Sequence, residues 1–72
     1  MSGWSREDAI AMERRHILEG EKRVARQQAL VRELIGKGHN QLANTANEVL
    51  AVLREALEFS RTRLRELEGP LR

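Results

Sequence analysis

The chain has 72 residues, of which 13 are basic, 11 are acidic and none is cysteine, and its net charge is +2. This length allows a single domain over residues 1–72, and the lack of cysteine excludes a disulfide framework and a thiolate metal site. Domains of this size are marginally stable unless a disulfide, a metal or self-association supports them, so self-association is the expected source of stability.

Apolar residues recur every seven positions in the first half of the chain, at Ile10, Ile17, Val24 and Val31. This spacing is typical of an amphipathic helix. Ser5, with an aspartate three residues later, is the predicted N-cap. The pattern predicts a helix over residues 5–35, after which Gly36 is expected to take the left-handed position that ends helices and Gly38 to be a second conformationally permissive residue.

A second helix is predicted over residues 40–68, with Asn40 as its N-cap and Gly69-Pro70 as its end. Its apolar positions recur at alternating steps of about four and three. The expected inward row is Leu42, Ala46, Val49, Leu53, Ala56, Ser60, Leu64 and Leu67.

Two helices of similar length joined by a turn of about five residues predict an all-α fold, an antiparallel two-helix hairpin. The charges favour the same arrangement. Residues 5–21 hold three arginines and five acidic residues, whereas residues 59–72 hold four arginines and two glutamates. An antiparallel pairing therefore sets an acidic helix start beside a basic helix end.

Further apolar residues widen both faces beyond a two-helix seam: Leu18, Leu30, Leu34, Ile35, Leu50 and Leu57. We therefore expect a second copy to cover them, giving a homodimeric four-helix bundle or a tetramer. The predicted oligomer interface consists of Ile10, Ile17, Gly20, Val24, Val31, Leu34, Val49, Leu53, Leu57 and Leu64.

Glu13 and His16 have the Glu-x-x-His spacing of bundles that bind two metal ions. Such a site also needs an inward glutamate from the second helix, and the only candidate, Glu58, is expected to point outward. We predict instead that both residues lie at the boundary of the seam, with His16 hydrogen-bonded to Ser60. His39 is assigned to the turn, and no catalytic triad, phosphate loop or zinc spacing is present. The sequence predicts neither an enzyme nor a cofactor.

Gly20 and Gln27 share a row of the seam. A glycine inside a helix costs roughly 1 kcal/mol relative to alanine. Close approach of another helix backbone would offset this cost at Gly20, whereas a surface position would merely tolerate it. Gln27 is expected either in a buried polar layer that sets the register or at a solvated edge.

Arg15, Lys22, Arg23 and Arg26 form a candidate partner face on the first helix. One interpretation is a solvated face with pairs such as Glu19 with Arg23. The other is a face that binds an acidic protein or a nucleic acid, although no aromatic residue is available there for base stacking. Trp4, before the cap, is expected to act as a hydrophobic staple or a bundle-end plug.

The segment from Glu13 to Gln27, with Leu34 and the Gly38-His39 pair, resembles a group of short bacterial helical-hairpin proteins of unassigned function. The similarity covers residues 13–39. In that group the second helix often carries a histidine at the position of Ser60 and an aromatic residue at that of Leu53, and this chain departs from both. The resemblance implies a hairpin fold and no activity.

The sequence predicts a non-enzymatic, self-associating helical-hairpin module for protein–protein interaction. The alternative is a small nucleic-acid-associated protein that uses the basic face of the first helix. No apolar run approaches the ~18 residues of a membrane span, and the first residues lack the pattern of a secretory signal. We therefore expect no membrane partner and a cytoplasmic location.

Overall fold

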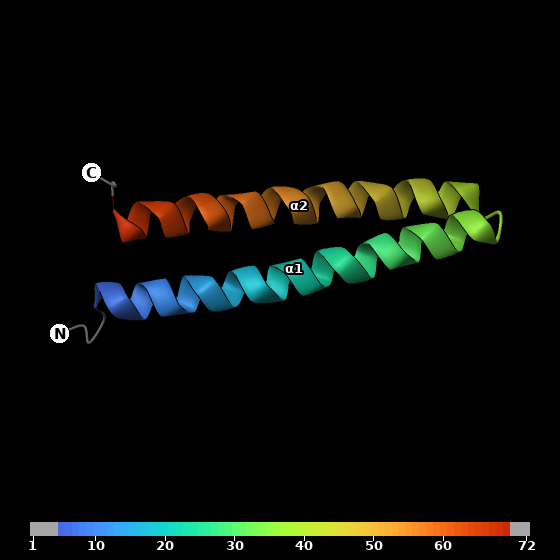
Figure 1. Ribbon diagram of the computed structural model, residues 1–72. Coiled ribbons are helices and arrows are strands. Elements are labelled where there is room, and N and C mark those ends of the chain that lie inside the picture. The colour runs from blue at the N-terminus through green and yellow to red at the C-terminus, as the bar shows by residue number, and fades with distance from the viewer. Residues whose placement is uncertain (1–4, 70–72) are drawn as a thin grey trace.

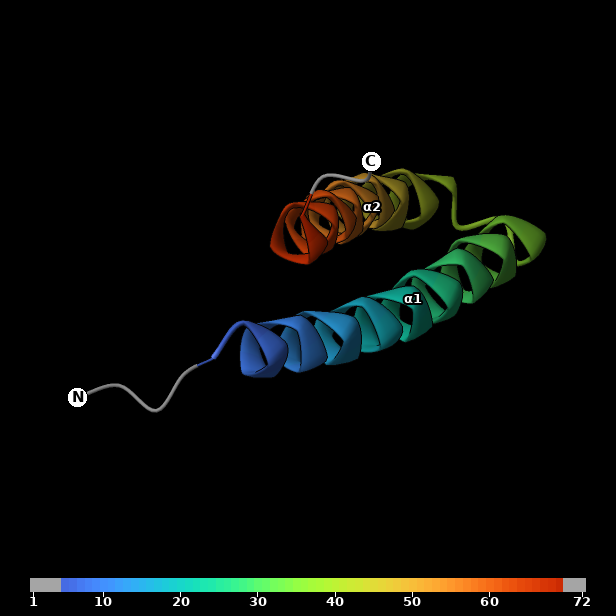
Figure 2. The same cartoon turned by 60° about the vertical axis from the view of Figure 1, so that its left-hand side comes forward.

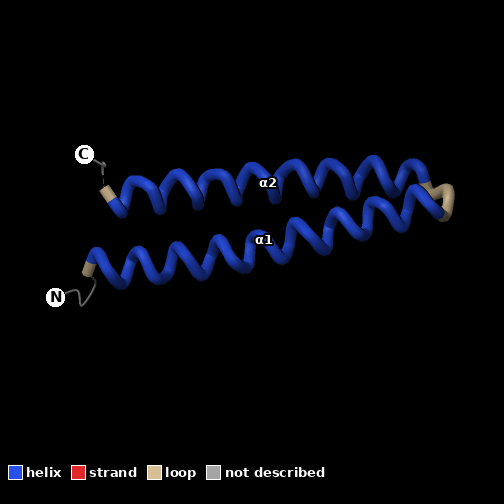
Figure 3. The backbone as a smooth tube through the Cα atoms, in the orientation of Figure 1, coloured by secondary structure: helices blue, strands red, loops and turns tan. Residues whose placement is uncertain are grey.

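The computed structural model describes residues 5–69 as two helices, α1 (Arg6–Gly36) and α2 (Asn40–Glu68). The helices contain 31 and 29 residues and lie antiparallel, side by side, joined by a turn of three residues (Figures 1 and 3). The predicted all-α antiparallel hairpin is confirmed. Neither helix has a stretch long and apolar enough to span a lipid bilayer.

The start of α1 is held by a capping box, as the sequence predicts. The Asp8 backbone N–H donates to the Ser5 hydroxyl at 3.1 Å, and the Ser5 N–H donates to the Asp8 carboxylate at 3.3 Å. Two of the N–H groups at this helix end thereby gain acceptors. Trp4, the proposed staple, lies outside the described residues, as does Pro70.

The end of α1 is a Schellman motif built on Gly38, so the assignment of the left-handed position to Gly36 is wrong. Gly38 has a φ of 79°, and its N–H donates to the Ile35 carbonyl at 3.0 Å. The His39 N–H donates to the Leu34 carbonyl at 2.9 Å. Gly36 is the last residue of the helix, and the right-handed backbone at Lys37 delays the reversal to Gly38.

The start of α2 also differs from the prediction, because His39 and not Asn40 is its N-cap. Asn40 already belongs to the helix, and His39 makes no side-chain capping bond. At the other end, Gly69 has a φ of 85°, and its N–H donates to the carbonyls of Arg65 and Glu66, both at 3.2 Å. A glycine end was predicted at this residue.

The core of the hairpin is a single seam, and part of the inward row predicted for α2 is wrong. Leu42, Val49 and Ala56 are exposed, and the residues that directly follow them, Ala43, Leu50 and Leu57, are buried in their place. The rest of the predicted row faces the seam, with Ala46 buried and Leu53, Ser60, Leu64 and Leu67 half-buried. The buried apolar residues are Ala43, Ala46, Leu50 and Leu57.

The helices lie closest together beside the turn and spread toward the open end (Figures 1 and 2). The small residues Ala43 and Ala46 lie at the turn end of α2 and allow this approach. At the open end, Ile10, Leu64 and Leu67 remain half-buried. No side chain of residues 5–69 is less than 2% exposed, so one hairpin does not enclose a dry core.

Candidate interaction surface

One flank of the seam is an open groove between the helices. Four of its lining residues are on α1 and four on α2: His16, Glu19, Gly20, Arg23, Leu53, Ala56, Leu57 and Ser60. The groove therefore brings His16 and Ser60 to one place, as the sequence analysis proposed. No hydrogen bond joins them among the described residues, and the His16 Nδ1 lies instead 3.9 Å from Glu13 Oε2.

Glu13 is the one buried charged residue in the described part of the chain. Its other oxygen, Oε1, lies 3.6 Å from the Nε of Arg63 on α2. This ion pair joins the acidic start of α1 to the basic end of α2, the arrangement that the charge distribution predicts. Both separations are too long for hydrogen bonds, and no fully buried side-chain oxygen in residues 5–69 is left without a partner. The Glu13 carboxylate therefore stays in reach of water.

The residues considered for a metal site do not converge. Glu58 pairs with Arg61 and its side chain is 63% exposed, so it points outward as predicted. Within residues 5–69 there is no group of three histidine, aspartate or glutamate side chains able to hold a metal ion. Glu13 and His16 instead occupy the boundary of the seam.

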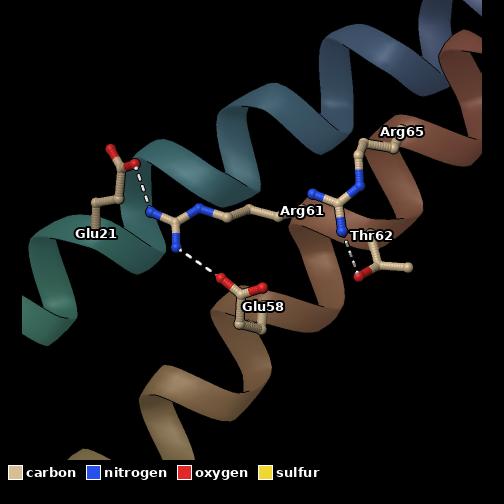
Figure 4. Close-up of polar contacts among 5 residues, drawn as sticks. All are labelled: Glu21, Glu58, Arg61, Thr62 and Arg65. Carbon is tan, nitrogen blue, oxygen red and sulfur yellow. Dashed lines mark hydrogen bonds and ion pairs between the residues drawn. The ribbon is translucent and has the colours of Figure 1, made fainter. Parts of the chain in front are cut away.

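The opposite flank carries a charged network centred on Arg61 (Figure 4). Its guanidinium donates to Glu58 at 2.9 Å on the same helix and to Glu21 at 3.1 Å on α1. Arg65 and Thr62 form a neighbouring bond of 3.1 Å. The hydrogen bonds to Glu58 and then to Glu21 raise the pKa of Arg61. An arginine is charged throughout the physiological range in any case, so this network makes the flank polar.

Two contacts tie the open end of the hairpin. The Arg6 guanidinium donates to the Leu67 backbone carbonyl, which is in the last turn of α2 and lacks a helical partner. Arg14 and Glu68 form an ion pair of 3.0 Å with exposed side chains. An exposed pair contributes at most about 1 kcal/mol, so these contacts orient the ends more than they stabilise them.

Gly20 faces α2 inside the hairpin. A Cβ atom added there would lie 3.1 Å from the Leu57 Cδ1, so the close approach is to a side chain and not to a helix backbone. Leu57 is only 7% exposed. Leu57 therefore packs mainly within its own chain, and its assignment to the oligomer interface stays a prediction.

Gln27 bridges the two helices. Its side-chain N–H donates to the Ala46 carbonyl at 2.8 Å, in a half-buried position. Of the two alternatives for this residue, the structure supports a polar contact in the seam. This directional hydrogen bond forms at one position in a seam that is lined mainly by aliphatic side chains. It therefore favours one register of the two helices over the neighbouring registers.

The remaining residues of the predicted interface divide by exposure. Val49 is exposed. The others are half-buried and face the seam: Ile10, Ile17, Gly20, Val24, Val31, Leu34, Leu53 and Leu64.

The exposed apolar surface also includes residues that the sequence analysis did not select. Val52 is 63% exposed and Phe59 is 77% exposed. Val52 follows Val49 by three residues and Phe59 follows Val52 by seven, so both lie on the flank of α2 that carries Val49. This heptad spacing was the signal in the sequence that would have found them.

The candidate partner face on α1 is also exposed. Lys22, Arg23 and Arg26 line a shallow depression with Glu19, and Arg15 lies on the same helix. The proposed pair of Glu19 with Arg23 is not formed. None of the four basic residues makes an ion pair with any residue from 5 to 69.

No protein-family model matches the chain, and no curated protein or solved structure matches it. The resemblance to short bacterial hairpin proteins thus stays a prediction. The features of this chain that bear on function are the groove, the exposed apolar flank and the charged faces.

Proposed function

We propose that this protein is a non-enzymatic helical-hairpin module that self-associates into a homodimeric four-helix bundle in the cytoplasm and serves protein–protein interaction. The supporting observation is the exposed apolar flank of α2. Leu42, Val49, Val52 and Phe59 are between 45% and 77% exposed, while the seam of the hairpin lacks a fully enclosed side chain within residues 5–69. Contiguous exposed apolar surface on a small protein marks an interaction site.

The energetics favour coverage by a second copy. Full burial of a valine, leucine or phenylalanine side chain stabilises by about 1.5–3 kcal/mol. Four such residues on each of two copies contribute roughly 10 kcal/mol after a discount for the surface that they already bury. This gain is of the size of the association cost, about 4–15 kcal/mol, so a dimer is feasible but not extremely tight.

Analytical ultracentrifugation over a wide range of protein concentration tests the proposal. The expected result is a monomer–dimer equilibrium whose helical content rises with concentration, because association and folding support each other. A folded monomer whose mass does not change with concentration would overturn it.

The second candidate is nucleic acid binding through Arg15, Lys22, Arg23 and Arg26. It is favoured by the position of all four on one helix, exposed and without acidic partners in the described chain. Binding through phosphates must weaken steeply with salt, because each neutralised phosphate releases counterions. A lack of retention of duplex and single-stranded DNA at about 50 mM salt would remove this candidate.

A further inference from the structure

The flank of α2 beside the groove carries an apolar stripe that no described residue covers. Leu42, Val49 and Ala56 are seven residues apart, and Val52 and Phe59 repeat the same step. All five are exposed. Ala56 also lines the groove, which places the stripe on that side of the hairpin. Alternating steps of three and four residues are the pattern by which helices pack in coiled coils.

The outer edge of α2, next to the stripe, is acidic. Glu48 and Glu55 each lie one helical turn before a residue of the stripe, and Glu66 lies five turns after Glu48 on the same edge. All three are exposed, and none forms an ion pair with a residue between 5 and 69. This acidic edge therefore has charge available for a partner.

The outer edge of α1, on the same side of the hairpin, is basic. Lys22 and Arg26 are one turn apart, and Arg15 lies two turns before Lys22. Glu19 and Arg23, which share a depression with Lys22 and Arg26, also line the groove, so the basic edge adjoins the same flank. The open flank thus has an apolar stripe on α2, between a basic border (the basic edge of α1) and an acidic border (the acidic edge of α2).

We propose that a second copy of the chain docks on this flank with the two-fold axis parallel to the helices. Both turns then lie at the same end, and α1 of each copy packs antiparallel against α2 of the other. This inference rests on the proposed self-association and specifies its geometry. The two-fold rotation keeps each residue at its own level along the axis, so the basic border of each copy meets the acidic border of the other.

Lys22 and Glu55 lie at the same level, that is, at the same height along the axis of the hairpin. Gly20 contacts Leu57 across the seam, so these two positions are at one level. Lys22 is two residues after Gly20, and Glu55 is two residues before Leu57, so these residues are level as well. In the proposed dimer Lys22 therefore faces Glu55 of the second copy.

The other two pairs are offset along the axis. Counted from the same contact of Gly20 with Leu57, Arg26 is level with position 51, three residues or about 4.5 Å from Glu48, and Arg15 is level with position 62, four residues or about 6 Å from Glu66. Long arginine and glutamate side chains span such offsets. Lys22 and Glu55 are therefore the best-matched pair, and the two arginine pairs flank it.

The α1 side of the interface is less apolar than the α2 side. Met12 and Leu30 are exposed and lie eighteen residues, or five turns, apart on this flank. Between them Glu19 and Arg23 are spaced to pair, and the methylene stem of the arginine can cover the apolar stripe while its charge stays at the edge. The stripe on α2 therefore supplies most of the apolar contact.

The alternative two-fold arrangement, with the axis across the helices, places the turns at opposite ends. It stacks α1 on α1 and α2 on α2. Lys22 would then lie along the basic border of the second copy, and Glu55 along its acidic border. Like charges at an interface are repulsive, so the charge distribution selects the arrangement with both turns at one end.

Charge reversal tests the pairing. We expect the Lys22→Glu/Arg26→Glu variant and the Glu48→Lys/Glu55→Lys variant each to dimerise about tenfold or more weakly than the unchanged chain. An equimolar mixture of the two should form a heterodimer about as tightly as the unchanged homodimer. The matched control is Arg32→Glu/Arg54→Glu, which reverses two charges on the opposite flank, where Arg54 lies near Glu21 and Glu58. This control should leave dimerisation nearly unchanged.

The position of the turns gives a second readout. The chain has no cysteine, so Lys37→Cys provides a single spin-label site in the turn. The proposed dimer brings the two labels close together, whereas the alternative separates them by nearly the 53 Å length of the hairpin. Labels at that long distance, or a dimer insensitive to the charge reversals, would overturn this geometry while self-association stands. A monomer at every concentration would overturn the proposed function itself.

Discussion

Replacement of Gly20 with alanine sets two opposing effects against each other. In an isolated helix the change stabilises by about 1 kcal/mol, because glycine has more backbone freedom to lose on folding. In the hairpin the new methyl group lies 3.1 Å from the Leu57 Cδ1, and 3.9 Å from its Cβ. Carbon atoms in favourable contact are about 3.5–4.0 Å apart, so the closest of these distances is repulsive.

The packing effect should be the larger of the two. Leu57 is buried, so it cannot move away without loss of its contacts in the seam. Overpacking of this kind costs about 1–3 kcal/mol. After subtraction of the helix-propensity gain, we expect Gly20→Ala to destabilise by about 1 kcal/mol. For a chain of this length the midpoint of thermal unfolding should fall by about 4–8 °C.

Thermal melts followed by far-ultraviolet circular dichroism measure this shift. They should be made at one protein concentration, because the midpoint of a self-associating chain depends on concentration. Gly36→Ala is the matched control. Gly36 is also helical, but an added Cβ there meets no atom within 4 Å, so this variant should be stabilised by up to about 1 kcal/mol.

A double-mutant cycle makes the reasoning refutable. In a Leu57→Ala background the crowding is gone, and Gly20→Ala should then stabilise, as Gly36→Ala does in the unchanged chain. If Gly20→Ala raises the melting temperature of the unchanged chain, the side chain of Leu57 relaxes without cost and the packing argument is refuted.

Four further substitutions test other parts of the structure. Gly38→Ala should destabilise by about 1–3 kcal/mol in urea unfolding, because the φ of 79° is strained for alanine; an unchanged midpoint would contradict the Schellman turn. Leu50→Asp should unfold the chain, because it buries an unpaired charge at a cost of several kcal/mol. Val52→Asp should abolish dimerisation and leave the chain with the helical content of the unchanged monomer, as measured by ultracentrifugation and circular dichroism; if Leu50→Asp and Val52→Asp behave alike, the assignment of Leu50 to the seam and Val52 to the outer flank is disproved. Ser5→Ala should cost about 0.5–2 kcal/mol through loss of the capping box, with faster amide exchange in the first turn of α1; unchanged exchange there would rule the cap out.

The candidate interaction surface was only partly predictable from the sequence. Lys22 and Arg26 could be recognised as part of a candidate partner face, because residues four positions apart always lie on the same side of a helix. The acidic border with Glu48 and Glu55 was not recognised, because these glutamates match the basic border only when both helices are placed side by side and their heights along the axis are known. These heights follow from contacts between residues far apart in the chain, such as Gly20 with Leu57.

The two helices, the Ser5 cap and the antiparallel hairpin could be predicted from the sequence, because periodicity, capping and a short turn act over a few neighbouring residues. Which of two neighbouring rows of α2 completes the seam depends on tertiary contacts. Leu50 and Leu57 have the same seven-residue spacing as Val49 and Ala56, so periodicity cannot separate the two rows. The rotation of α2 that buries Leu50 is set where Leu57 packs on Gly20 and where Gln27 reaches the opposite helix. This rotation also leaves Val49, Val52 and Phe59 exposed for a partner.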